Sequence, residues 1–372
     1  MTPQDLAELY LLSRSLWWRH ELGLLSDQAV SELIKVLRSA RAGIVAQIEA
    51  EAQGLASISE WTRERNDQIS AWIDEVFAGT SASVTSYISE ASVGVALASV
   101  ATYNSILSFD GKAKAVKLVE GLTQEQVKQF FQDQPLGGKL LSDWVGNAFS
   151  TGARDSILDA IREGVVMGEG YRKLVKRVMT AADAGFSITQ REATTLVRTY
   201  VQSANTGAQE AVYEQNEGII KGYKRVETLD NRTCRICALA DGAMYGKNEK
   251  RPELPAHPNC RGVYVPILKT FREIGLNIDE LEEVARPWTI REQGPIGTGG
   301  RKILNFGTTK ENFGGWWESL SAEDKLKTSV GPVRGRLLQE GLVRWEDLSD
   351  KRTGLPYTLE QLGFDEQGNP LR

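Results

Sequence analysis

The feature that most constrains this chain is a cluster of rare residues. The 372 residues include three cysteines and two histidines. All three cysteines and one histidine fall within 27 residues, as Cys234-Arg-Ile-Cys237, then 19 residues, then His257-Pro-Asn-Cys260. Two cysteines three positions apart can turn both sulfurs toward one point, and a second pair from a distant turn completes a tetrahedron. The pattern therefore predicts a four-ligand metal site, and we call these four residues the Cys/His cluster.

Three thiolates and one imidazole are typical of structural zinc, because no coordination position is left for water, whereas catalytic zinc keeps one open. We therefore expect a structural Zn²⁺ held by Cys234, Cys237, His257 and Cys260. Two alternatives stay open: free thiols in a metal-free knuckle, and a thioredoxin-like redox pair. The redox pair fits less well, since we see no helical pattern after the second cysteine and no βαβ frame around it.

The net charge and its distribution limit the classes of partner that the chain is suited to bind. The net charge is −5 and the pI about 5.5, which argues against a chain whose main task is to coat nucleic acid, since that task needs many cations. Between Lys221 and Arg261, however, nine Lys or Arg face five Asp or Glu, a balance of +4 that leaves −9 for the rest. We call residues 221–261 the finger region. We expect a solvated loop there, with a weak contact to DNA or to an acidic face of a partner protein as the alternative.

Neither the composition nor the start of the chain suggests an exported protein. With 41% hydrophobic and 25% charged residues, the composition is ordinary for a globular chain of two or three structural units. The polar start, Met1-Thr2-Pro3-Gln4-Asp5, predicts no signal peptide, so we expect a reducing cytoplasm. Residues 91–109 are uncharged but rich in Ser, Thr and Asn, so we expect a buried helix and no stable membrane insertion, with a membrane segment as the alternative.

Helical periodicity dominates the first 215 residues. Residues 1 to about 75 predict helices, with Ser26 or Asp27 capping the start of the second one. Trp17 and Trp18 are adjacent, so they cannot both face one core. Residues 76–110, rich in Ala, Ser, Gly and Val, predict a close-packed helical hairpin. Further amphipathic helices are predicted at residues 123–134, 155–162, 171–179 and 189–215.

The pattern then changes. Residues 219–229 and 261–268 predict two strands on either side of the Cys/His cluster. The Gly-rich residues 294–300 predict a flexible connector, since no Gly-Lys-Ser/Thr ending marks a phosphate loop. From about Phe313 we expect a short helical module. Its signals are the capping pairs Ser321 with Asp324 and Thr358 with Gln361, and Gly341 at the end of a helix over residues 334–340.

The order of these features resembles the Mu F-like domain of phage minor head proteins, the head-morphogenesis family. The resemblance covers roughly residues 165–365 and rests on three stretches. The first is the helix with Val197-Arg198-Thr199 and Asn205. The second is Thr228-Leu229-Asp230-Asn231-Arg232-Thr233-Cys234-Arg235-Ile236-Cys237, with Asp241-Gly242 and Pro255-Ala256-His257-Pro258-Asn259-Cys260-Arg261. The third is Trp316-Trp317, Val330-Gly331-Pro332-Val333-Arg334, Gly341, Trp345-Glu346-Asp347-Leu348 and Tyr357-Thr358-Leu359-Glu360-Gln361-Leu362.

Two positions depart from the family pattern. The family often has Arg-Thr-Glu in the long helix, where this chain has Tyr200 after Arg198-Thr199. The family's closing pair is often Cys-Arg-Cys, where this chain has Cys260-Arg261-Gly262. The first departure removes an acidic residue and any role it has. The second leaves one cysteine fewer but still four candidate ligands.

Together these observations predict an α+β, mostly helical fold. We expect a helical N-terminal region at residues 1–165, then a Mu F-like core at 166–290 with a small β element and a zinc-knuckle-like loop. Residues 291–372 would form the Gly-rich connector and a small helical C-terminal module.

The resemblance implies a structural role. It implies a minor head protein that joins the portal protein at the portal vertex during head assembly, with the major capsid or scaffolding protein as further partners. The protein would be found in the virion head and, during assembly, in the host cytoplasm. The sequence leaves open whether it is packaged inside the head and leaves with the DNA.

The residues favour a non-enzyme. We find no nucleophile elbow, no nucleophile with a histidine base, and no metal site with an open position. Two alternatives of other classes remain. One is a zinc-dependent nucleic-acid enzyme or toxin-like effector, which would need clustered carboxylates, where only Asp230, Asp241, Glu249 and Glu253 are available. The other is a DNA-binding adaptor inside the capsid.

Overall fold

The structure is a computed structural model of the full chain, and we describe residues 3–53, 63–108, 123, 125, 139–167, 169, 171–269, 285–291, 303–350 and 355–371. The fold is α+β and mostly helical, as predicted. The chain divides into two compact units built from separate segments. Unit 1 comprises Met1–Glu21, Ala98–Glu120 and Asn205–Arg372, and unit 2 comprises Leu22–Leu97 and Gly121–Ala204. The predicted three-part division stays a prediction.

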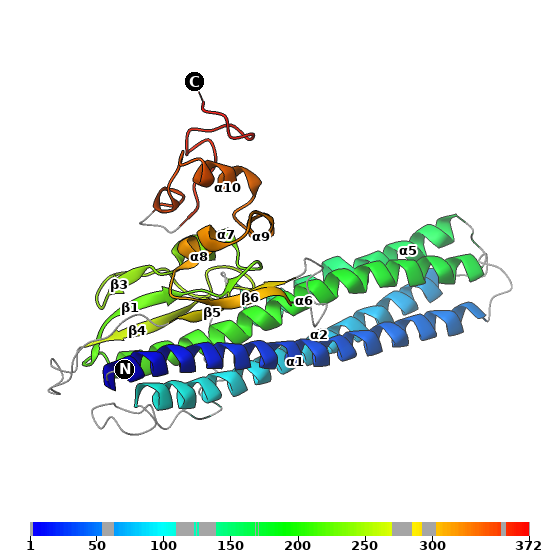
Figure 1. The fold of residues 1–372 in the computed structure, drawn as a ribbon. Coiled ribbons are helices and arrows are strands. Elements are labelled where there is room, and N and C mark those ends of the chain that lie inside the picture. Colours follow the sequence, from blue (N-terminus) through cyan, green and yellow to red (C-terminus); the bar gives the residue numbers. More distant parts are fainter. Residues whose placement is uncertain are drawn as a thin grey trace. The chain divides into compact units, whose positions relative to one another are not determined.

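Unit 2 is a bundle of helices (Figure 1). It contains parts of three long helices, α1 (Pro3–Gln53), α2 (Arg63–Leu107) and α6 (Tyr171–Gln215). Shorter elements complete it: α4 (Leu141–Phe149), the π-helical segment η2 (Ser150–Arg154) and α5 (Asp155–Val166). The predicted helix at residues 155–162 is therefore confirmed, whereas residues 123–134 lie almost wholly outside the described residues.

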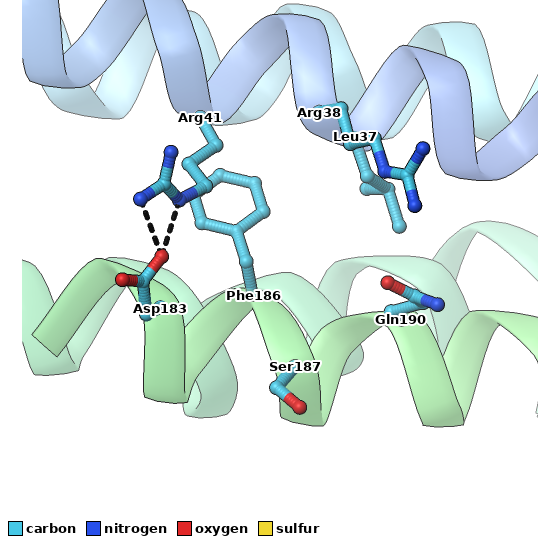
Figure 2. Close-up of a pocket in the computed structure, with 7 residues that line it drawn as sticks. All are labelled: Leu37, Arg38, Arg41, Asp183, Phe186, Ser187 and Gln190. Atoms are coloured by element: carbon cyan, nitrogen blue, oxygen red, sulfur yellow. Dashed lines mark hydrogen bonds and ion pairs between the residues drawn. The ribbon is translucent and has the colours of Figure 1, made fainter. Parts of the chain in front are cut away.

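Aromatic rings and ion pairs join the helices of unit 2. The Phe77 ring of α2 stacks on Phe186 of α6 and meets Phe149 of α4 edge-on. Figure 2 shows Arg41 of α1 paired with Asp183 of α6 beside the Phe186 ring. A surface pocket of about 480 Å³ lies at this contact. The apolar packing supplies most of the stabilisation, because partly exposed ion pairs contribute at most about 1 kcal/mol each.

The long helices run without interruption through three places where the sequence predicts a break. The predicted helix start at Ser26 or Asp27 is wrong, because α1 is continuous there. Ser26 is buried, and the Asp27 carboxylate accepts a 3.0 Å hydrogen bond from Arg198 of α6, so a capping signal is used for packing instead. The separate helices predicted at residues 171–179 and 189–215 are one helix, α6.

The helical hairpin predicted at residues 76–110 is also wrong, since α2 runs through without a turn. Hydroxyl groups that often favour turns instead donate to the carbonyl four residues earlier in the same helix. Thr80 Oγ1 bonds Val76 O at 2.7 Å, and Ser92 Oγ bonds Ile88 O at 2.8 Å. The polar side chains are thereby satisfied inside the helix, and a small-residue composition does not require a turn.

The uncharged stretch of α2 was predicted to be buried. One helix of the described residues, over Asp67–Leu107, is long and apolar enough to cross a membrane by length and composition, and half of its most apolar window is buried. Within unit 1, Ser99 Oγ donates to Asn205 Oδ1 at 3.1 Å and the Tyr103 ring meets Tyr213 edge-on. These contacts favour a core helix, and the lack of membrane insertion stays a prediction.

The α-helical part of unit 1 supports two small sheets. The strands predicted on either side of the Cys/His cluster are confirmed as β1 (Ile220–Val226) and β4 (Val263–Leu268), which pair antiparallel. β3 (Met244–Gly246) pairs antiparallel with the other edge of β1. In the second sheet, β2 (Leu229–Asp230) runs parallel to β5 (Arg286–Arg291), which pairs antiparallel with β6 (Ile303–Thr309). Within the described residues each sheet has three strands.

The adjacent tryptophans of α1 face different ways, as predicted. Trp18 is buried, and its indole Nε1 donates to Asn205 Oδ1 of α6 at 2.9 Å. Trp17 is 44% exposed, with the Arg14 guanidinium 4.8 Å from its ring centroid. Next to Trp18, Arg19 donates to the carbonyl oxygens of Val226 and Glu227. Trp18 and Arg19 therefore fix the start of α1 to α6 and to the end of β1.

The predicted C-terminal helical module is present. It contains α8 (Phe313–Ser319), α9 (Ala322–Leu326), α10 (Pro332–Gln339) and the 3₁₀ turn η3 (Trp345–Asp347). Both predicted capping pairs form, with Asp324 N donating to Ser321 Oγ at 3.1 Å and Gln361 N to Thr358 Oγ1 at 3.1 Å. Gly341 follows α10 with φ of +70°, the left-handed conformation of a helix end. We call Phe313–Leu371 the C-terminal module.

An aromatic core lies beneath this module. Its buried members come from the second sheet, from the helix at residues 235–240 and from the module itself: Leu229, Ile290, Ala238, Phe313, Trp316, Trp317, Leu320 and Val330. Gly314 leaves room for the Trp345 ring, since a Cβ at that position would lie 2.8 Å from it. The predicted Gly-rich connector at residues 294–300 lies outside the described residues.

The long-helix packing of unit 2 makes a direct prediction for Gly185→Ala. A Cβ at Gly185 would lie 2.6 Å from Ala153 Cα and 2.7 Å from Gly152 O, so α6 and η2 must separate. We expect a loss of about 1–3 kcal/mol in the free energy of unfolding. The matched control is Gly79→Ala in α2, where the added Cβ meets nothing within 4 Å and should stabilise by about 0.5–1 kcal/mol. Urea denaturation of both variants measures this, and a neutral Gly185→Ala would contradict the close helix approach.

Candidate metal centre

The two halves of the Cys/His cluster come from two turns of the finger region. Cys234 is the N-cap of the short helix α7 (Arg235–Ala240), and Cys237 lies buried within it. His257 and Cys260 lie in the turn that leads into β4. The expectation that no helix follows the first cysteine pair is therefore wrong. Among the described strands β1 pairs antiparallel with β3 and β4, and the parallel pair β2–β5 has β3 and β4 as well as α7 between its members, so it is not a simple βαβ unit.

The side chains of the cluster converge. His257 Nε2 lies 3.0 Å from Cys234 Sγ and 3.1 Å from Cys237 Sγ. Ligand atoms of these three residues lie within 4.8 Å of one another. Cys260 Sγ joins them 3.7 Å from Cys237 Sγ. A tetrahedral zinc with bonds of about 2.3 Å has sulfur–sulfur edges of about 3.8 Å, which the Cys237–Cys260 distance matches. Cys260 is not one of the three residues whose ligand atoms all lie within 4.8 Å of one another, so in this structure three ligands are gathered and the fourth lies beside Cys237.

The turn from His257 to Cys260 depends on one unusual residue. Asn259 has φ of +61°, in the left-handed region that asparagine tolerates better than most residues. The turn is closed by Cys260 N, which donates to His257 O at 3.1 Å. His257 Nδ1 lies 2.8 Å from Pro258 O, and because a carbonyl only accepts, Nδ1 carries the proton. Nε2 is thereby presented as the metal-binding nitrogen, the usual arrangement for a ligating histidine.

Contacts within the cluster shift the ligand pKa values in opposite directions. Hydrogen bonds from the Cys237 side chain lower the pKa of both Cys234 and Cys260, although burial opposes this. The same two contacts, together with burial, raise the pKa of Cys237. The hydrogen bond with Cys234 raises the pKa of His257 to about 9. These contacts favour the thiolate forms of Cys234 and Cys260 and the protonated forms of Cys237 and His257.

A buried ion pair lies directly behind Cys237. Arg225 of β1 donates from Nε to Glu227 Oε1 at 2.8 Å, and both side chains are almost completely buried. Burial raises the pKa of Glu227 to about 7, against the opposing effect of Arg225. Gly262 must be glycine here, because a Cβ would lie 2.2 Å from Glu227 Oε1. The residue after Cys260-Arg261 therefore makes room for the carboxylate.

The loop before Cys234 is held by Asp230. Its buried carboxylate accepts two hydrogen bonds from Arg261, at 2.7 and 2.8 Å, and one from Thr233 Oγ1 at 3.0 Å. Burial alone would raise the pKa of Asp230, but Arg261 holds it below its usual range. Because Arg261 follows Cys260 directly, this pair joins the two halves of the Cys/His cluster.

Asp241 joins four segments at the other end of α7. Its carboxylate accepts Glu227 N at 2.8 Å, Phe313 N at 2.7 Å and both terminal nitrogens of Arg286. Glu227 follows β1, Arg286 begins β5, and Phe313 begins the C-terminal module. The next residue, Gly242, has φ of +84°, a conformation that side chains rarely adopt. The motif Asp241-Gly242 therefore has a structural function, as a charged junction and the turn after it.

The finger region contains no free carboxylate cluster. Asp230 and Asp241 are buried in the arginine pairs described above. The Glu249 carboxylate accepts Gly246 N at 2.9 Å in an exposed turn, and Glu253 is exposed. The described residues of this region therefore offer no arrangement that would favour a nuclease.

Most of the local positive charge is also compensated. Five of the nine basic residues counted between Lys221 and Arg261 form ion pairs: Arg225, Arg232, Lys247, Arg251 and Arg261. The balance of +4 therefore overstates the field available to DNA phosphates. A weak DNA contact through this region stays a prediction.

Several residues around the centre were not predicted from the sequence. The pairs Arg225–Glu227 and Asp241–Arg286 were missed, as was Arg19, whose pKa burial lowers to about 10. One signal was available: Arg225 and Glu227 are opposite charges two positions apart in a predicted strand, so their side chains lie on the same face. Charges at such positions must be paired if they are buried.

Comparison with known proteins gives one family. Residues 155–265 match the model of the family described as Phage Mu protein F like protein. No curated protein and no solved structure matches the chain. The matched segment extends from α5 to β4 and contains all four residues of the Cys/His cluster.

Metal binding should release about two protons per ion at pH 7, because the contacts described above favour thiolates at Cys234 and Cys260 and protons on Cys237 and His257. Titration calorimetry in buffers of different ionisation enthalpy measures this number. Since the pKa of His257 is raised to about 9, affinity should rise with pH up to that value and fall as the solution is acidified. Release of about three protons, as expected for thiols with ordinary pKa values, would contradict the thiolate assignment.

Asp241→Asn should destabilise the protein by about 3–5 kcal/mol, because Arg286 is left buried without a counter-charge. The control is Asp347→Asn, which breaks the exposed pair with Arg344 and should cost at most about 1 kcal/mol. Denaturant unfolding of both variants makes the comparison. Equal losses would show that Asp241 is not the junction described above.

Proposed function

We propose that this chain is a minor head protein acting in phage head morphogenesis, because residues 155–265 match the model of the family described as Phage Mu protein F like protein. The family match carries the proposal. The geometry supports it, because the matched segment combines a long helix, a small sheet and a candidate metal centre with no open catalytic arrangement among its described residues. Such a segment is suited to presenting surfaces that other proteins bind.

We infer that the Cys/His cluster holds a structural Zn²⁺ through Cys234, Cys237, His257 and Cys260. Three sulfurs and one imidazole nitrogen fill the four positions of tetrahedral zinc, so the ion would cross-link two turns and bind no substrate. The support is the convergence of the ligand atoms and the hydrogen bond that orients His257. The ion would fix α7 against the turn before β4, and α7 in turn packs on the aromatic core through Ala238.

We propose the portal protein as the main partner, with the major capsid or scaffolding protein as further contacts. The chain would then be found at the portal vertex of the virion head, and in the host cytoplasm during assembly. Packaging inside the head and ejection with the DNA is a further part of this proposal. The exposed Trp17, on a helix whose next residue is firmly buried, is a suitable contact residue for a protein partner.

We further propose that the chain is not an enzyme. The described carboxylates near the cluster are buried in ion pairs or exposed singly, and one of the two histidines belongs to the cluster. A zinc-dependent nucleic-acid enzyme would need a free acid or base beside the metal.

The test combines metal content with co-purification of the portal protein. Wild-type protein should contain one zinc per chain, and Cys234→Ser and His257→Ala should lose both the metal and portal binding, because the cross-linked turns separate. His20→Ala is the matched control, since it removes the chain's other histidine, which is exposed on α1, and should keep the metal. Wild type without metal but with portal binding would remove the zinc proposal, and metal with no portal binding would remove the portal proposal.

A further inference from the structure

The three sulfurs of the Cys/His cluster each receive an N–H group. Cys234 Sγ accepts the backbone N–H of Cys237 at 3.5 Å. Cys260 accepts backbone N–H groups of Gly262 and Ala256. Cys237 Sγ accepts Arg225 Nη2 at 3.7 Å. The sulfurs of Cys234 and Cys260 therefore accept from backbone N–H groups, and the sulfur of Cys237 accepts from a charged side chain.

Arg225 is held in place for this contact from its other side. Its Nε donates to Glu227 Oε1 at 2.8 Å, and the backbone N–H of Glu227 donates to Asp241. Arg225, Glu227 and Cys237 are each at most 2% exposed, so the guanidinium has no water to compete for its hydrogen bonds. A planar guanidinium can serve two acceptors at fixed angles, which an ammonium group does less well.

The contact between Arg225 and Cys237 places a positive charge beside the metal ligands. Zinc with three thiolates and a neutral imidazole has a net charge of −1, and a buried negative group is costly without a nearby cation. Outside the cluster's own His257, Arg225 is the side-chain cation of the described residues for which a hydrogen bond to a cluster sulfur is seen. Groups that hydrogen-bond to metal ligands orient them and tune the charge on the ligand atoms.

We propose that Arg225 is a positioning residue of the metal centre, which orients the Cys237 sulfur and balances the charge of the thiolate-bound ion. The proposal rests on the zinc site proposed above and is independent of the role in head assembly. Glu227 supports it by fixing the guanidinium, and Gly262 supports it by leaving space for that carboxylate.

The test uses the full chain loaded with Zn²⁺, and with Co²⁺ as a spectroscopic probe of the sulfur ligands. Arg225→Met should weaken Zn²⁺ affinity about 10- to 100-fold in a chelator competition. It should also shift the sulfur-to-cobalt charge-transfer band, because the Cys237 sulfur loses its hydrogen bond. Arg225→Lys keeps the positive charge but loses the planar guanidinium that serves two acceptors. Its Zn²⁺ affinity should therefore lie between those of the wild type and Arg225→Met.

Because Arg225→Met leaves Glu227 buried without a partner, a second variant separates metal binding from folding. The double variant Arg225→Met/Glu227→Leu removes the pair together, a change that is often neutral for stability. It should fold and still show the weakened affinity and shifted band. Arg251→Met is the matched control, since Arg251 pairs with Glu210 and stacks on Tyr223 in the same sheet, with no hydrogen bond to a cluster sulfur. It should keep wild-type affinity and spectrum.

The outcomes separate the two proposals. Wild-type protein that binds neither ion would overturn the metal site and with it the role of Arg225. Metal binding with wild-type affinity and spectrum in the folded double variant would overturn the role of Arg225 alone. An Arg251→Met variant as weak as Arg225→Met would also overturn it, because the effect would then follow general loss of stability.

Discussion

The organisation of unit 1 depends on the buried carboxylate of Asp241. It accepts hydrogen bonds from the chain after β1, from Arg286 at the start of β5 and from Phe313 at the start of the C-terminal module. One anion therefore joins both sheets to the module, and the aromatic core with Trp316 and Trp317 forms around that junction. A buried charge of this kind stabilises only when every partner is in place, so the segments are expected to order together.

The Cys/His cluster and the arginine pairs form one continuous polar network. Arg261–Asp230 joins the two turns that carry the cysteines, and Arg225–Glu227 joins Cys237 to the backbone bonded by Asp241. The finger region is thus rich in paired charges. A metal bound at the cluster would add the cross-link that so small a sheet lacks, as structural zinc does in other small domains.

The sequence predicted the parts of this arrangement that depend on local chemistry. The cysteine spacing predicted that Cys234, Cys237 and His257 lie together, with Cys260 beside Cys237. Alternation predicted β1 and β4, and the capping residues predicted the turns that begin at Ser321 and Thr358. It did not predict the pairings set by tertiary contacts. Ser26 and Asp27 are typical helix-cap residues, yet Ser26 is buried and the Asp27 carboxylate accepts a hydrogen bond from Arg198. The partners Arg286 and Phe313 of Asp241 are 45 and 72 residues away, where no local pattern connects them.

The central claim is that four residues of the finger region form a closed metal centre. X-ray absorption at the zinc edge of the purified, zinc-loaded full chain tests it most directly. The structure predicts a first shell of three sulfurs at about 2.3 Å and one nitrogen at about 2.0 Å, with no oxygen. A shell that contains water oxygen or fewer than three sulfurs would contradict a closed structural site at Cys234, Cys237, His257 and Cys260.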